Sequence, residues 1–189
     1  MGQRIVILCM ALGLSTSLAQ SFYEDSLYLR GQKLYFLSTQ SEKYLQETER
    51  VFEMLIRRYG PHPPLQMYLY GITALKARYA SNLLKKREYL FTAIAQMDAQ
   101  VERTPDDIEV RFIRGSFYYY LPFFLGKRKF AQSDLKSVAS LLLRYPDQYT
   151  KRYSGEVLRA IVSFLRETEW LEEEQLAQLE KIYFRRGAL

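Results

Sequence analysis

The fold class is indicated most clearly by residues 65–79, which read LQMYLYGITALKARY. Apolar side chains recur there at steps of three or four residues: Leu65, Tyr68, Leu69, Ile72, Leu75 and Tyr79. That spacing places them along one stripe of an α-helix. No part of the chain alternates between apolar and polar residues for long enough to predict a strand. Glycine and proline are scarce, at nine and six residues, so we predict an all-α fold.

Similar helical stretches recur along the chain every 40–45 residues. Each copy contains a glycine, a later aromatic residue and a closing proline. The glycines are Gly31, Gly71 and Gly115; the aromatic residues are Tyr44, Tyr89 and Phe130; the prolines are Pro61, Pro105 and Pro146. Three kinds of marker in the same order over three copies predict three structural repeats.

Each repeat is expected to form two antiparallel helices, with the glycine in the first helix and the aromatic residue early in the second. The units span about residues 22–61, 62–105 and 106–146. Two further amphipathic segments over residues 148–189 are interpreted as a capping pair, because a stack of repeats needs a polar outer face at its end. Residues 20–189 are therefore expected to form a single helical-repeat domain.

A glycine in the first helix, an aromatic residue early in the second and a closing proline resemble the tetratricopeptide repeat. In that family the glycine lets the paired helices pack closely, the aromatic side chain fills the gap between them and the proline ends the second helix. The resemblance covers about residues 22–146 and implies an α-solenoid that binds a protein partner. The family's repeat is about 34 residues long. Its leucine before each glycine is replaced here by Arg30, Tyr70 and Arg114.

The N-terminal residues are typical of an export signal. Arg4 precedes an apolar run from Ile5 to Leu14, and Ser17-Leu18-Ala19 then supplies small residues where a signal peptidase cleaves. The apolar run is too short to span a bilayer, which needs about 20 residues. A membrane anchor or a buried first strand is the alternative interpretation. We predict a signal peptide over residues 1–19, cleavage after Ala19, and a periplasmic or secreted protein.

The only cysteine, Cys9, lies inside this predicted signal. Ile7 and Leu8 precede it, whereas acylation of a lipoprotein cysteine needs small residues there. Cleavage would leave a chain with no disulfide and no thiolate nucleophile or metal ligand. Secreted eukaryotic domains of this size usually carry disulfides, so a bacterial periplasm is the expected compartment. Residues 109–130 are also similar to a group of small exported bacterial proteins of unknown role.

The chain is basic, with a formal net charge of +6. Export argues against nucleic acid as the partner and favours anionic lipid, polysaccharide or acidic protein surfaces. Two clusters occupy equivalent positions just before the repeat aromatic residues: Lys85, Lys86 and Arg87, and Lys127, Arg128 and Lys129. If the units stack in register, both clusters lie on one edge and can meet an anionic membrane or polymer. The alternative is a pair of solvated turns.

Residues 117–125 read FYYYLPFFL and form the most aromatic stretch of the chain. One interpretation is a central helix buried on all sides, ended or kinked by Pro122. The other is a groove for an apolar ligand or a partner peptide. Its candidate lining residues are Tyr118, Tyr119, Tyr120, Phe123 and Phe124.

Catalytic and metal-binding patterns are missing from the sequence. His62 is the only histidine and has no partner at a metal-ligand or acid–base spacing. The acidic groups at 106–109 and 172–174 lie near predicted helix N-termini, where acidic residues favour the helix dipole. Thr104 and Asp107 have the capping-box spacing, which places Pro105 at the first position of a helix. We expect no metal, no cofactor and no enzymatic activity.

These observations favour a non-enzymatic protein-binding or scaffold module of the bacterial periplasm. The alternative is an accessory protein of an envelope transport system that binds a small apolar ligand on the aromatic segment. A remote alternative is an envelope hydrolase, which export and basic charge suit but for which no catalytic residue can be named.

Overall fold

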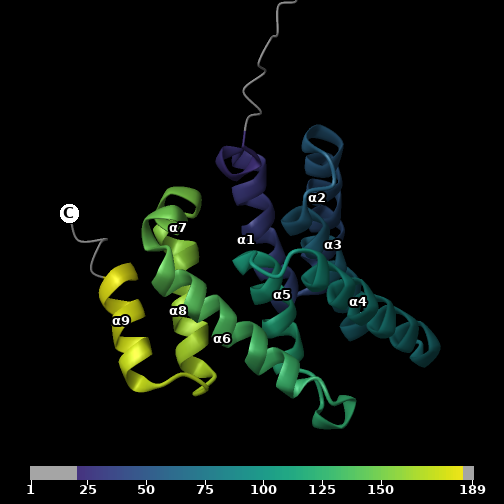
Figure 1. Cartoon of the computed structure of the whole chain (residues 1–189). Helices are drawn as coiled ribbons and strands as arrows, with labels where there is room; N and C mark the ends of the chain where they lie inside the picture. Colours follow the sequence, from purple (N-terminus) through teal and green to yellow (C-terminus); the bar gives the residue numbers. More distant parts are fainter. Residues whose placement is uncertain (1–20, 185–189) are drawn as a thin grey trace, which may run out of the picture.

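The computed structural model describes residues 21–184. The predicted signal peptide, Cys9 and the predicted cleavage site lie outside the described residues, as do residues 185–189. The described part contains nine α-helices and three short 3-10 helices, and no strand (Figure 1). The α-helices are α1 (Ser26–Gln40), α2 (Leu45–Tyr59), α3 (Pro63–Tyr79), α4 (Leu83–Arg103), α5 (Ile108–Tyr119), α6 (Arg128–Arg144), α7 (Pro146–Arg152), α8 (Gly155–Glu167) and α9 (Glu173–Tyr183). The 3-10 helices are η1 (Phe22–Glu24), η2 (Glu42–Tyr44) and η3 (Phe123–Leu125).

Consecutive helices pack as antiparallel pairs, α1 with α2, α3 with α4, α5 with α6 and α8 with α9. The first three pairs follow the predicted units in order, so the all-α prediction and the sequential pairing are confirmed. The C-terminal prediction was one helix short, because α7 precedes the last pair. Pro146 opens α7 at a position where its missing N–H costs nothing.

Two of the three glycines allow close packing within a pair. A methyl group on Gly31 would lie 3.0 Å from the Phe52 ring on α2, and one on Gly115 would lie 3.0 Å from Leu135 on α6. Gly71 differs, because the methyl group would meet the Tyr35 ring on α1, at 2.9 Å. This glycine therefore serves the contact with the preceding pair, which corrects the sequence interpretation.

Phe130 departs from the expectation that each repeat aromatic residue fills the gap within its pair, whereas Tyr44 is half-buried against the core of α1–α4. Phe130 is 50% exposed, and its ring lies beside the Lys127 ammonium and the Arg114 guanidinium. Tyr89 is half-buried on α4, and Tyr44 lies in η2 just before α2. The three prolines do follow the ends of α2, α4 and α6, as predicted.

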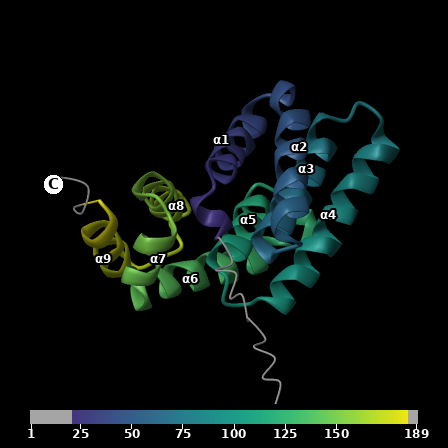
Figure 2. The ribbon, with the colours of Figure 1, turned by 90° about the horizontal axis from the view of Figure 1, so that it is seen from above.

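The core consists of two large apolar clusters that meet at α5. One contains buried side chains of α1–α4 together with Val110 and Ile113 of α5. The other contains Ile108 of α5 and side chains of α6–α9. Figure 2 shows the same arrangement, with α1–α4 on one side, α7–α9 on the other and α5 and α6 between them. None of the helices found in residues 21–184 is long and apolar enough to cross a membrane.

Side-chain caps fix several helix starts. Asp107 accepts hydrogen bonds from the backbone N–H groups of Glu109 and Val110, at 2.9 and 3.1 Å, and so begins α5. The predicted capping box with Thr104 is wrong, since Thr104 directly follows the last residue of α4 and Pro105 lies in the connecting turn. Asn82 caps α4 in the same way as Asp107 caps α5.

Candidate functional site

The five aromatic residues of the predicted groove point in different directions. α5 ends at Tyr119, so Pro122 follows the end of a helix as expected. Tyr118 is 1% exposed and donates a hydrogen bond of 2.8 Å to Asp98. Tyr119 packs edge-on against Phe164 and Trp170. The remaining three are exposed, Tyr120 at 67%, Phe123 at 86% and Phe124 at 73%.

Most of the predicted basic residues face solvent. Lys85, Lys86 and Arg87 lie in the first two turns of α4, where every side chain from residue 81 to residue 88 is exposed. Arg128 and Lys129 are exposed at the start of α6, and the Arg128 guanidinium lies 5.3 Å from the Trp170 ring. None of these five residues forms an ion pair with another residue of 21–184.

Lys127 belongs instead to an internal network centred on Arg114. The Arg114 guanidinium binds both carboxylate oxygens of Asp134, at 2.6 and 2.9 Å, and one oxygen of Asp98, at 2.8 Å. Asp134 is fully buried and also accepts a bond from Arg111 at 2.8 Å. Such two-point pairing is strong and directional. The arginine that departs from the repeat consensus therefore joins α4, α5 and α6.

Lys127 completes the network with a bond of 2.8 Å to the other oxygen of Asp98. Burial by itself would raise the pKa of Asp98. Hydrogen bonds from Lys127 and Tyr118, together with the charges of Lys127 and Arg114, bring that pKa below its ordinary value. The carboxylate of Asp98 is thus held in its charged form by neighbouring cations.

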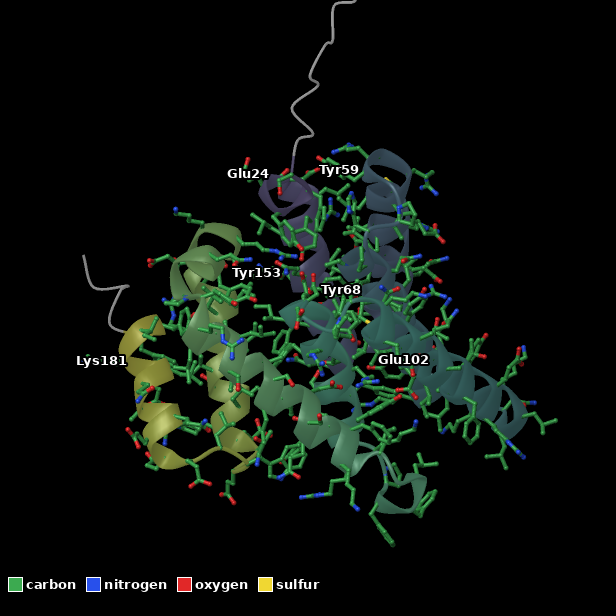
Figure 3. The ribbon with its side chains drawn as sticks, in the orientation of Figure 1. Glu24, Tyr59, Tyr68, Glu102, Tyr153 and Lys181 are labelled. Atoms are coloured by element: carbon green, nitrogen blue, oxygen red, sulfur yellow. The ribbon has the colours of Figure 1, made fainter. Side chains whose placement is uncertain are left out.

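A second polar centre surrounds Glu109, which is only 5% exposed. Its Oε1 accepts hydrogen bonds from Tyr28, from the Tyr68 hydroxyl at 2.5 Å and from Gln32 Nε2 at 3.0 Å. Its Oε2 accepts one from the Tyr153 hydroxyl at 3.2 Å. The donors come from α1, α3 and the residue after α7, and Figure 3 shows Tyr68 and Tyr153 in the middle of the molecule. This centre links the two large apolar clusters.

No cation among residues 21–184 forms an ion pair with Glu109. Burial therefore raises the pKa of its carboxyl group to about 7, although the hydrogen bonds from Tyr28 and Tyr68 oppose the shift. The nearby guanidinium of Arg152 lies 4.0 Å from the centre of the Tyr23 ring and binds Asp107 at 3.1 Å.

Sequence reasoning missed the role of Glu109. It grouped this residue with the acidic residues of a helix N-terminus, which is correct for Asp107 but wrong for the side chain of Glu109. The sequence pattern does indicate that Glu109 lies on the inner side of α5, because the apolar residue Ile113 lies one turn further along the same side. Ile113 is buried in the structure. A carboxylate on an apolar side of a helix needs internal donors.

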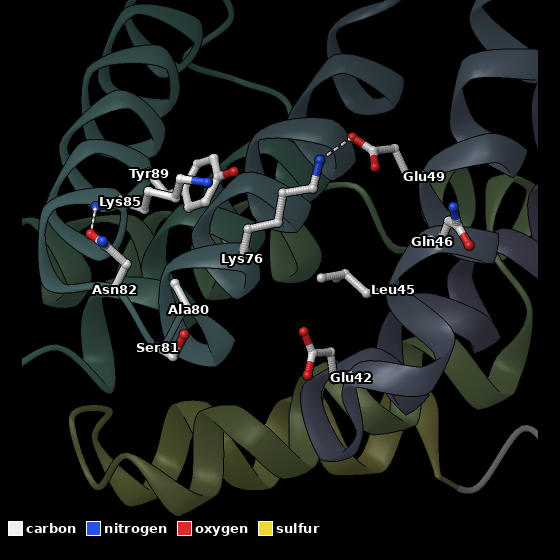
Figure 4. A pocket seen from close by; sticks show the side chains of 10 residues that line it. All are labelled: Glu42, Leu45, Gln46, Glu49, Lys76, Ala80, Ser81, Asn82, Lys85 and Tyr89. Carbon is white, nitrogen blue, oxygen red and sulfur yellow. Dashed lines mark hydrogen bonds and ion pairs between the residues drawn. The ribbon is translucent and has the colours of Figure 1, made fainter.

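An open hollow lies between α2, α3 and the start of α4, with a volume of about 490 Å³ (Figure 4). Its lining mixes charged, polar and small side chains: Glu42, Leu45, Gln46, Glu49, Lys76, Ala80, Ser81, Asn82, Lys85 and Tyr89. Lys76 and Glu49 form an ion pair across it. A second hollow of about 390 Å³ lies on α9. None of the five predicted groove residues lines either hollow.

His62 lies in the exposed connection before α3, with its ring 5.2 Å from that of Phe22. Across residues 21–184, no group of three or more histidine, cysteine, aspartate or glutamate side chains is arranged to hold a metal ion. The described carboxylates of the interior are instead engaged by arginine, lysine or tyrosine.

Comparison of the chain with protein-family models, with curated proteins and with solved structures gave no match.

Proposed function

We propose that the chain is a non-enzymatic binding protein, a tetratricopeptide-like stack of helix pairs that holds a protein partner on the face formed by its first helices. The contacts between pairs support this stack, since α1 contacts α3 and α3 contacts α5. Equivalent glycines support it as well, because a methyl group on Gly31 or on Gly115 would lie 3.0 Å from a side chain on the second helix of the same pair. The periplasmic location expected from residues 1–19 remains part of the proposal.

We choose this face because α1 has a second apolar stripe, which is exposed. Its inner side buries Tyr28, Gly31 and Leu34, whereas Leu29 and Phe36 on another side are 48% and 62% exposed. Leu29 and Phe36 are seven residues apart and so lie on one side of the helix. Exposed apolar side chains in such a row are typical of surfaces that a partner covers.

The stripe also borders the face where the first helices meet. Gln32, on the adjacent side of α1, donates hydrogen bonds to the Tyr68 hydroxyl of α3 and to Glu109 of α5, at 3.1 and 3.0 Å. Lys33 lies between the two exposed apolar residues and has no ion pair within the described chain. The partner segment we propose therefore presents apolar side chains beside acidic ones.

The proposal is tested by crosslinking in the native envelope. A photoreactive side chain at position 36 should give a discrete adduct, and the double variant Leu29→Glu/Phe36→Glu should abolish recovery of the same partner. Met54→Glu is the matched control, because Met54 is 41% exposed on α2 and lies outside the stripe. Equal recovery with the double variant and with the control would refute this face as the binding surface.

A further inference from the structure

The first two turns of α4 stand out from the rest of the fold. Leu83 and Leu84 are both 77% exposed although they lie in a regular helix. The Asn82 side chain accepts hydrogen bonds from the N–H groups of Leu84 and Lys85, at 2.9 and 3.1 Å, so the helix start is fixed by its own cap. Two leucines are thus presented to solvent beside three cationic side chains.

The turn between α5 and α6 repeats this combination. Phe123 and Phe124 in η3 are 86% and 73% exposed. Gly126 follows with φ of +67°, a left-handed conformation that favours glycine and turns the chain into α6. Arg128 and Lys129 come directly after it and are exposed. The turn therefore presents two aromatic rings next to two cations.

The turn packs against the middle of α4, on the side of the helix that also carries Leu84. Leu84, Phe91 and Asp98 are spaced by seven residues and share one side of α4. Asp98 binds Lys127, the residue just before α6, at 2.8 Å. Leu90 of α4 and Leu121 of the turn also pack on the same small buried cluster. Figure 1 shows the start of α4 and the turn projecting at the lower right of the molecule.

We propose that this surface docks the protein peripherally on an anionic lipid bilayer. The apolar-basic surface consists of Leu83, Leu84, Phe123 and Phe124 with the cations at 85–87 and 128–129. The apolar side chains enter the headgroup and upper acyl region, and the cations contact lipid phosphates. This proposal is independent of the protein-binding stripe on α1.

The apolar-basic surface combines cations with exposed apolar side chains, and this combination favours a bilayer over other anionic partners. The five cations have no ion-pair partner among residues 21–184, and Glu88 is the one acidic residue in either segment. A soluble anionic polymer would be bound by the cations alone and would leave four large apolar side chains in water. A bilayer accommodates both kinds of side chain at the depth where each is stable.

The test measures binding of the purified protein to vesicles of phosphatidylglycerol and phosphatidylcholine, with the same N-terminus in every variant. Lys85→Gln/Lys86→Gln/Arg87→Gln should weaken binding by about 100-fold, since each cation near such a surface contributes about fivefold. Phe123→Ser/Phe124→Ser should weaken it by about tenfold or more. Vesicles of phosphatidylcholine alone should bind weakly, and added salt should reduce binding to the anionic vesicles.

The matched control removes the same charge elsewhere, with Lys136→Gln/Lys151→Gln/Lys181→Gln at three exposed positions on α6, α7 and α9. Its binding should stay close to that of the unchanged protein. An equal loss in this control would overturn the proposal in favour of net charge alone. No effect of Phe123→Ser/Phe124→Ser would also overturn it, and would point to a soluble polyanion or an acidic protein.

Tryptophan fluorescence gives an independent test, because it reports how deeply position 124 enters the bilayer. Phe124→Trp should show a blue-shifted emission and quenching by brominated lipid on anionic vesicles, beyond the signal of Trp170 in the unchanged protein. Circular dichroism of each variant checks that the helices are retained. Emission from position 124 that stays unshifted and unquenched on bound protein would rule out insertion of the turn.

Discussion

Two polar centres on α5 stabilise buried or half-buried carboxylates by different means. Around Arg114, the carboxylates of Asp134 and Asp98 are matched by arginine and lysine side chains. Around Glu109, the partners are three tyrosine hydroxyls and one glutamine amide. The pKa of Asp98 is lowered, whereas burial raises the pKa of Glu109 to about 7. Asp98, which has cationic partners, stays charged, whereas Glu109, which has neutral donors, becomes a proton-binding group near neutral pH.

The largest expected effect comes from disrupting the centre around Arg114, the cation-matched centre, in which arginine and lysine pair with Asp134 and Asp98. Arg114→Met leaves the fully buried Asp134 with Arg111 as its remaining cationic partner. We expect the free energy of unfolding at pH 7 to fall by about 3–5 kcal/mol, the usual result of removing one partner of a buried pair. Urea unfolding followed by circular dichroism measures this loss.

The control for Arg114→Met is Arg166→Met, which removes an arginine whose side chain is 50% exposed and pairs at the surface of α8. That change should cost about 1 kcal/mol or less. Similar losses for the two variants would mean that the buried pair adds nothing beyond a surface pair.

The second prediction concerns pH and the Glu109 centre. The folded-state pKa of about 7 exceeds the ordinary value of 4.5, so between these values the folded chain binds a proton that the unfolded chain releases. The contribution of Glu109 to stability is therefore full at low pH and is lost as pH rises towards 7. Relative to Glu109→Gln, the unchanged protein should lose about 2.5 kcal/mol of stability between pH 5 and pH 8.

The measurement compares urea unfolding of the two proteins at several pH values. Asp98 provides the opposite sign, because its lowered pKa gives stability that is present above 3.8 and is lost on acidification. A stability difference between the unchanged protein and Glu109→Gln that does not vary with pH would contradict the assignment for Glu109.

A smaller effect is expected from removing one phenol donor. Tyr68→Phe keeps the ring stacked on Phe52, at 4.2 Å between centroids, and removes the hydroxyl that binds Glu109. We expect a loss of about 1 kcal/mol at pH 8, and less at pH 5, where Glu109 is protonated. Tyr70→Phe is the control, because Tyr70 lies on the same helix with no side-chain hydrogen bond among those found in residues 21–184. A loss that is equal at both pH values would argue against a bond to the carboxylate.

The smallest expected change in the free energy of unfolding concerns Lys127, at the solvent-exposed edge of the cation-matched centre. The Lys127 side chain is 20% exposed and binds Asp98, so Lys127→Gln should cost about 0.5–1 kcal/mol. Lys129→Gln changes the same charge two residues later, at an exposed position with no ion pair among residues 21–184, and should leave stability unchanged. Equal values for the two variants would place Lys127 outside the network.

The helical parts of the fold were predictable from local patterns. The apolar spacing of residues 65–79, the glycines and the prolines led to the correct class and to the first three helix pairs. Helix α7 was missed because its seven residues are too few to show a clear period. The helix start at Asp107 was placed too early because the Thr104 spacing matched a capping box that the chain does not form.

Local sequence patterns could not predict the two polar centres on α5. Arg114 was noticed only as a departure from a repeat consensus, and its partners Asp98 and Asp134 lie on other helices. The donors to Glu109 are 81, 41 and 44 residues away for Tyr28, Tyr68 and Tyr153. The aromatic segment was recognised as unusual, but its division into a buried Tyr118 and an exposed Phe123 depended on where α5 ended.

The sequence alone determined the fold class and the order and pairing of α1 to α6, because periodicity and prolines act between residues a few positions apart. Only the tertiary structure decided which charged side chains lie inside, which of them have cationic partners and which apolar side chains remain in water. Those outcomes depend on the distances between helices that are far apart in the chain, and these distances set the cost of desolvation and the strength of each pairing.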